Sequence, residues 1–176
     1  MAETFEQMLT GGHPNSLGRT VEVVDLVLAD PERVGELLAC YRSHDEVVRL
    51  RTSSAMKRIE AVRRDLVLPL VDRLIDEIGN LDQASAQWTL ATLFGRMKND
   101  LSEEQKTGTL AIMKRNLAGH GDWIVLNTTM ETLAIWSSGD PTLKRWLKPH
   151  LERLAGETRK SVAGRARKML AKHYGD

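Results

Sequence analysis

The sequence has a single cysteine, few aromatic residues and no long apolar run. Because Cys40 is alone, no disulfide can form within the chain, which is typical of a reducing compartment. Aromatic residues make up only 5% of the 176 residues, and this argues against an all-β core because strands favour ring-bearing side chains. Apolar runs such as residues 66–71 are too short to span a membrane, and the first ten residues lack the features of a signal peptide. The expected location is cytoplasmic.

Motifs for metal binding or nucleophilic catalysis are also missing. The five histidines are scattered, and no two lie three or four residues apart on one helix. The zinc-protease, serine-hydrolase and phosphate-loop signatures do not occur. The glycine pair Gly11-Gly12 could suggest a phosphate loop, but no strand precedes it, and a flexible lead into a helix explains it better. We predict no catalytic residue, no metal ligand and no cofactor, and we favour a non-enzymatic protein while leaving catalysis open.

What the sequence does contain is helical punctuation and helical periodicity. Asp30-Pro31 and Asp140-Pro141 place an N-capping carboxylate before a proline in the first helical turn. Residues 102–105 have the pattern of a capping box. Between such marks the apolar residues recur every three or four positions, which predicts amphipathic helices. The expected fold class is all-α.

Comparison of the sequence with itself indicates a repeat. Val48, Ala86, Val125 and Val162 begin equivalent segments 38, 39 and 37 residues apart. The residues 4, 7, 8 and 11 positions later, most of which are apolar, lie with them on one helical face. Another apolar-striped segment precedes each of these. We call the first helix of each pair A and the second B. We expect A helices near 31–42, 67–79, 103–118 and 141–155, and B helices near 45–62, 83–98, 122–138 and 158–173.

This register predicts one domain over residues 1–176. Residues 1–30 form its N-terminal cap, with a short helix near 4–9 and a longer one over 16–29. A cap is expected because repeats of this kind bury their apolar faces only by stacking on neighbours. The four repeats lie near 31–64, 65–100, 101–139 and 140–176.

Two B segments carry a resemblance to a known repeat family. Residues 45–51 and 160–166 look like the start of a HEAT B helix, in which a charged residue and an apolar residue precede Val and Arg, whereas Gln87 and Leu126 stand where an arginine would be usual in the second and third repeats. Over residues 31–174 the chain resembles the HEAT-like (armadillo-type) repeat superfamily and is similar in fold to bacterial DNA-alkylation-repair HEAT-like proteins. The resemblance implies an α-α superhelix of about four helix pairs, whose B helices line a concave surface.

The charges of the B segments are uneven. Residues 45–64 carry six Lys or Arg against three Asp or Glu, and residues 158–175 carry six against none. A basic groove of this kind would attract phosphates. The alternative is that these side chains only solvate helix faces.

The row of B-helix positions that points away from the predicted core suggests a binding site. Trp88 stands out because a large aromatic side chain is unexpected in solvent, and Asn127 and Glu131 follow on the next B helix. Together they would form a recognition pocket, framed by Arg49, Arg51, Arg165 and Lys168. The alternative is that Trp88 packs between repeats. The other tryptophans, Trp123, Trp136 and Trp146, are expected to be packing residues.

The sequence suggests two hypotheses for the function. The first is a non-enzymatic scaffold that binds a protein or peptide partner on its B-helix face. The second is a nucleic-acid-binding protein, including a glycosylase of the alkylation-repair kind in which Trp88 and Glu131 would serve as the groove's aromatic and acidic residues. Neither a membrane nor a small-molecule cofactor is expected as a partner.

Overall fold

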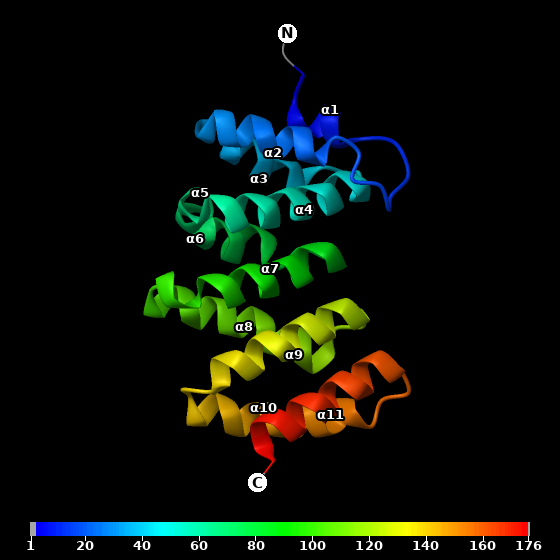
Figure 1. Ribbon diagram of the computed structural model, residues 1–176, viewed down its shortest axis with the longest axis vertical. Helices are drawn as coiled ribbons and strands as arrows, with labels where there is room; N and C mark the ends of the chain where they lie inside the picture. Colours follow the sequence, from blue (N-terminus) through cyan, green and yellow to red (C-terminus); the bar gives the residue numbers. More distant parts are fainter. Residues whose placement is uncertain (1–2, 176) are drawn as a thin grey trace. The chain divides into compact units, whose positions relative to one another are not determined.

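The computed structural model describes residues 3–175, and every regular element among them is helical (Figure 1). The prediction of an all-α fold is therefore confirmed. Within residues 3–175, no helix has the length and apolar character needed to cross a bilayer.

The helices follow the predicted order of A and B segments. The cap holds α1 (Phe5–Leu9) and α2 (Thr20–Ala29). The first pair consists of η1 (Pro31–Arg33), α3 (Val34–Ala39) and η2 (Cys40–Arg42), followed by α4 (Glu46–Val62). The second pair begins with α5 (Arg64–Val67), η3 (Leu68–Leu70), α6 (Val71–Arg73) and η4 (Leu74–Ile78), and ends with α7 (Ala84–Met97) and η5 (Lys98–Asp100). The last two pairs are α8 (Glu103–Gly119) with α9 (Trp123–Ser137), and α10 (Pro141–Ala155) with α11 (Lys160–Tyr174).

The chain divides into two compact units, residues 1–89 and residues 90–176, and the division falls within α7. In the first unit, α4 packs against α1, α2 and α3. In the second, α9 packs against α8, α10 and α11. The single domain and the superhelix remain predictions.

The repeat register describes the buried face of the B helices correctly. Val48, Ala86, Val125 and Val162, the four starting positions, are each 0% exposed. The positions 4, 7, 8 and 11 residues further on are buried in α4, α7 and α9. In α11 the last of them, Leu170 and His173, are only half-buried.

The predicted caps are mostly present. The Asp140 side chain accepts hydrogen bonds from the backbone N–H groups of Thr142 and Leu143, and Ser102 forms the predicted capping box with Gln105. Asp30 differs, because Pro31 begins a 3₁₀ turn there and the Asp30 side chain makes no capping bond. The second cap helix was expected from residue 16 but begins at Thr20, since residues 14–19 form turns.

Gly164 provides a test of helix propensity in α11. It is exposed inside the helix, and no atom lies within 4 Å of the place where a Cβ would be. Gly164→Ala should therefore raise the free energy of unfolding by about 1 kcal/mol, measured by urea denaturation. Gly18→Ala is the contrasting variant, because Gly18 has φ +51° and an added Cβ would lie 2.8 Å from Arg51 Cζ. A loss of stability in Gly164→Ala would contradict the expectation.

Cys40 is expected to be chemically inert in the folded protein. Its side chain is 3% exposed, and its thiol donates to the Glu36 carbonyl. Burial, together with the nearby charges of Glu6 and Glu36, raises the pKa of this thiol to about 12. Because the thiolate is the reactive form, alkylation at pH 8 should be slow in buffer and fast in denaturant. Rapid labelling of the native protein would show that Cys40 is accessible.

Candidate functional site

The first unit contains a cleft of about 370 Å³ built from three segments. One wall is Pro14–Leu17, from the loop between α1 and α2 (blue in Figure 1). The α4 wall includes Leu50, Ser54 and Lys57, and Trp88 of α7 completes the lining. The cleft thus lies on two consecutive B helices and on the loop of the N-terminal cap.

A second hollow of about 180 Å³ adjoins this cleft. Pro14, Leu50 and Trp88 line both hollows, so they form an apolar divide between them. Leu50 and Trp88 are half-buried, and Leu17 in the larger cleft is 43% exposed. These apolar side chains are held at the surface by the fold, which is the arrangement of a binding site rather than of a core.

The wall formed by residues 10–19, which we call the cap loop, is shaped by Arg51. The Arg51 side chain is 2% exposed. Its Nη1 donates to the carbonyls of Leu9 and Gly11 at 2.6 Å each. The same guanidinium reaches three further carbonyls of this chain segment, those of Thr10, His13 and Ser16. One buried cation therefore orders the backbone of nearly the whole loop.

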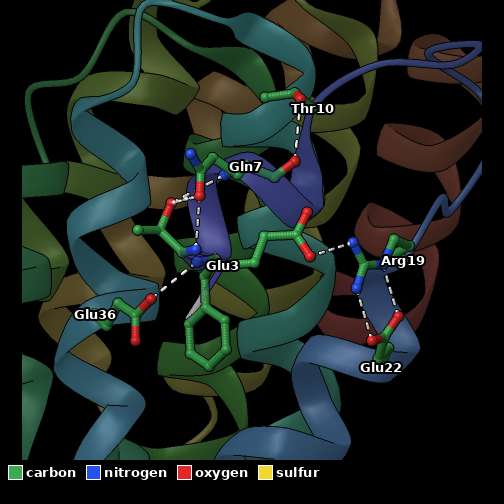
Figure 2. A network of polar contacts seen from close by, with 8 residues as sticks. Glu3, Gln7, Thr10, Arg19, Glu22 and Glu36 are labelled. Carbon is green, nitrogen blue, oxygen red and sulfur yellow. Dashed lines mark hydrogen bonds and ion pairs between the residues drawn. The ribbon is translucent and has the colours of Figure 1, made fainter. Parts of the chain in front are cut away.

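Polar contacts at both ends of the cap loop complete its anchoring (Figure 2). Before the loop, α1 begins with a capping box between Thr4 and Gln7. The backbone N–H of Phe5 donates to Glu36 Oε1 at 2.9 Å, which ties α1 to α3.

At the other end, Arg19 forms ion pairs with Glu3 and Glu22, each at 2.7 Å. The Arg19 guanidinium hydrogen-bonded to Glu22 lowers the pKa of that carboxyl. Both pairs are exposed and contribute little energy individually. Their effect is to fix where the loop ends and α2 begins.

The electrostatic character of the larger cleft differs from that of the unit around it. Residues 1–89 contain ten Lys and Arg against fifteen Asp and Glu. Among the described residues that line the larger cleft, none is acidic, and the two cations are Lys57 and Arg51. Arg51 is 2% exposed, whereas Lys57 is half-buried, so Lys57 is the more accessible cation of the two. The smaller hollow differs from the larger cleft, because its lining includes the carboxylate of Glu46.

The predicted binding residues of the first unit have different surroundings. Trp88 was expected either to be exposed at a binding site or to pack between repeats. It is half-buried, which lies between these alternatives, and it lines both hollows. Arg49 donates to Gln83 Oε1 at 2.9 Å and to the Ser43 carbonyl at 2.7 Å, so it ties α4 to the segment before α7. The expectation that Arg51 lies on an outer face is wrong, because the cap loop covers it.

The remaining predicted residues belong to the second unit. Asn127 is 7% exposed and donates to Ser161 Oγ at 3.0 Å, so its predicted outward orientation is wrong because the first turn of α11 covers it. Glu131 accepts a hydrogen bond from Arg165, and both side chains are partly exposed. Lys168 is exposed on α11. Trp88 and these four residues thus lie in different units.

The other tryptophans divide into packed and exposed. Trp136 is 3% exposed, as expected of a packing residue. Trp146 is half-buried, and its ring centroid lies 4.1 Å from that of His150. Trp123 is 51% exposed, so the expectation that it packs in the core is wrong. It stands at the first position of α9 and lines a hollow with Arg159, Lys160 and Ser161.

Sequence reasoning missed the contribution of the cap loop. Gly11 and Gly12 were interpreted as a flexible lead into a helix, but their positive φ angles of 73° and 75° belong to a loop held on Arg51. The sequence feature that could have predicted this contact is Arg51 in the buried half of α4, together with the glycine-rich segment of the cap. Arginine in such a place needs several acceptors, and loop carbonyls supply them.

Replacement of Arg51 should loosen the cap loop and lower stability. Arg51→Met fills similar space but donates no hydrogen bonds, so we expect a loss of about 2–4 kcal/mol in the free energy of unfolding. Limited proteolysis should then cut within residues 10–19 much faster than in the wild type. Arg58→Met is the matched control, since Arg58 is exposed on the same helix. Equal cleavage of both variants would show that Arg51 does not hold the loop.

Comparisons with known proteins do not supply a function for this geometry. No family model, curated protein or solved structure gives a significant match to the chain. The features of the first unit that bear on function are the cleft, its apolar divide and the Lys57 side chain in its lining.

Proposed function

We propose that the protein is a non-enzymatic interaction module whose first unit binds an extended peptide segment of a partner protein. The observation that carries the proposal is the divide of Pro14, Leu50 and Trp88 between two adjoining hollows. Tryptophan is among the residues that most often dominate binding energy in protein interfaces. Here its ring is held at the surface by α7.

The two hollows suit neighbouring side chains of one peptide. In an extended chain alternate side chains point the same way, about 6–7 Å apart. One apolar side chain would enter the larger cleft against Leu17 and Leu50, while the peptide crosses the divide at Trp88. The hydroxyl of Ser54 and the amide of Asn15 offer hydrogen bonds to the peptide backbone.

The charge of the larger cleft favours a particular peptide composition. Lys57 lies on its α4 wall, and the described lining includes no carboxylate. A peptide with an acidic residue next to an apolar one would place its carboxylate near Lys57. Electrostatic complementarity of this kind selects partners more than it adds affinity.

The proposal extends to the architecture. Four helix pairs with starting positions 37–39 residues apart support a HEAT-like repeat array in which α4, α7, α9 and α11 are successive B helices. The proposed cleft lies on the first two of them. Helical repeat proteins commonly bind partners along such a surface.

The glycosylase alternative receives less support from the contacts. A carboxylate that activates water must be available to it, whereas the Glu131 carboxylate is hydrogen-bonded to Arg165.

Selection from a random peptide display library tests the peptide proposal. Enriched peptides should combine an apolar residue with an adjacent Asp or Glu, and calorimetry should give measurable affinity. Trp88→Ala should lower that affinity about 30-fold, the effect of losing a typical interface hot spot of about 2 kcal/mol. Trp123→Ala is the matched control, because Trp123 is an exposed tryptophan of the other unit.

A charge reversal examines the role of Lys57 separately. Lys57→Glu should shift the selected peptides from acidic to basic residues while the apolar residue is retained. Failure of the library to enrich any peptide, or unchanged affinity in Trp88→Ala, would overturn the proposed function.

A further inference from the structure

Positive charge is concentrated in the last helix pair. Residues 141–175 contain ten Lys and Arg against two Glu, in a chain whose net charge is only +1. The first unit, by contrast, has an acidic excess. The positive excess of the last helix pair is a strong electrostatic feature, and the peptide cleft does not use it.

On α11 the positive charges form a regular exposed row. Lys160, Lys168 and Lys172 are exposed, as is Gly164 between them. The four positions are spaced by four residues, or about 6 Å along the helix axis for each step. They lie opposite the buried residues Val162, Ala166 and Met169. Among the described residues, none of the three lysines has a carboxylate within 4 Å.

Three carboxylates of the second unit, Glu157, Glu131 and Asp122, already have partners. Glu157 pairs with Arg159 at 2.6 Å, and Glu131 pairs with Arg165. Asp122 caps α9, where its Oδ1 accepts from the backbone N–H groups of Ile124 and Val125. The lysine row therefore faces solvent with its positive charge largely uncompensated.

An exposed aromatic ring adjoins the start of the row. Trp123 lines a hollow of about 270 Å³ together with Arg159, Lys160 and Ser161. Arg159 donates to the Gly121 carbonyl at 2.6 Å, which holds the loop before α9 against the loop before α11. This contact fixes Trp123 beside two cations, with half of its surface in solvent.

We propose that Trp123 and the lysine row of α11 bind single-stranded nucleic acid. One base stacks on the Trp123 indole in the hollow beside Lys160, and the phosphates that follow run along Lys160, Lys168 and Lys172. A cationic track with an aromatic platform is the arrangement that binds single strands without sequence preference. Gly164 carries no side chain, so the strand lies close to the helix between the first two lysines.

Other polyanions fit these residues less well. In a duplex the bases are already stacked inside the helix and cannot reach Trp123. An acidic peptide would match the lysines but has no planar group for the ring. An anionic membrane favours apolar side chains beside the cations, whereas Val162, Ala163, Ala166 and Met169 of α11 are buried.

Fluorescence anisotropy with a labelled oligo(dT) of about 15 nucleotides tests the proposal. If three or four phosphates are neutralised, affinity should fall about 20- to 50-fold between roughly 50 and 200 mM salt. Lys168→Gln should lower the slope of log affinity against log salt by about 0.7. Lys106→Gln is the matched control, since Lys106 pairs with Glu103 on α8, and it should leave the slope unchanged.

The aromatic contact has its own variants. Trp123→Leu should weaken binding about tenfold or more, and Trp123→Phe should retain most of the affinity because it keeps a ring for stacking. Trp88→Ala should bind the oligonucleotide as the wild type does, so failure of the peptide proposal and failure of this one are distinguishable.

Several outcomes would overturn the assignment. These are no binding at low salt, equal or tighter binding of a duplex of the same length, and unchanged affinity in Trp123→Leu. Competition by polyglutamate as effective as by unlabelled oligo(dT) would identify an acidic protein surface as the partner instead. Binding to phosphatidylserine vesicles with no oligonucleotide binding would identify a membrane.

Discussion

The buried guanidinium of Arg51 is the contact on which the first unit depends. A guanidinium stays charged in a protein interior, and removing it from water is unfavourable unless acceptors surround it. Here the acceptors are backbone carbonyls of one short segment rather than a carboxylate. Hydrogen bonds from a cation are stronger than those between neutral groups, and the loop in turn acquires a defined shape.

The N-terminal cap and the candidate cleft are consequences of this contact. Phe5 and Leu9 of α1 are 0% exposed, and Arg33 lies over the Phe5 ring at 3.9 Å. Because Arg51 bonds to the last carbonyl of α1 and to those of the following loop, α1, the loop and α4 form one structural element. The same loop presents Pro14 and Leu17 to the cleft, so covering the first repeat and building the cleft depend on the same residues.

The sequence predicts this fold well wherever the determining contacts are local or periodic. The positions equivalent to Val48 are buried in every repeat because the hydrophobic period of a helix is visible in its own residues. Outer-face positions were predicted less well. A helical wheel contains no information about what covers a helix from outside, and both Arg51 and Asn127 are covered by segments that are distant in sequence, the cap loop and the start of α11.

For the candidate site, the sequence singled out Trp88 and Lys168 but not the residues that surround each of them. Trp88 lines the cleft with Pro14 and Leu50, and Trp123 lines a hollow with Arg159 and Lys160. Trp123 was missed because a tryptophan is expected to be buried, whereas the first residue of a helix often lacks neighbours. These groupings depend on loop conformation, which has no periodic signature.

The opposite charges of the two halves have a consequence for the behaviour of the whole chain. Residues 1–89 have five more acidic than basic residues, and residues 90–176 have fifteen basic against nine acidic. An isoelectric point calculated for the whole chain averages these contributions and describes neither half. At neutral pH and low salt, such a molecule is retained by anion-exchange and cation-exchange resins alike, each through a different end of the sequence.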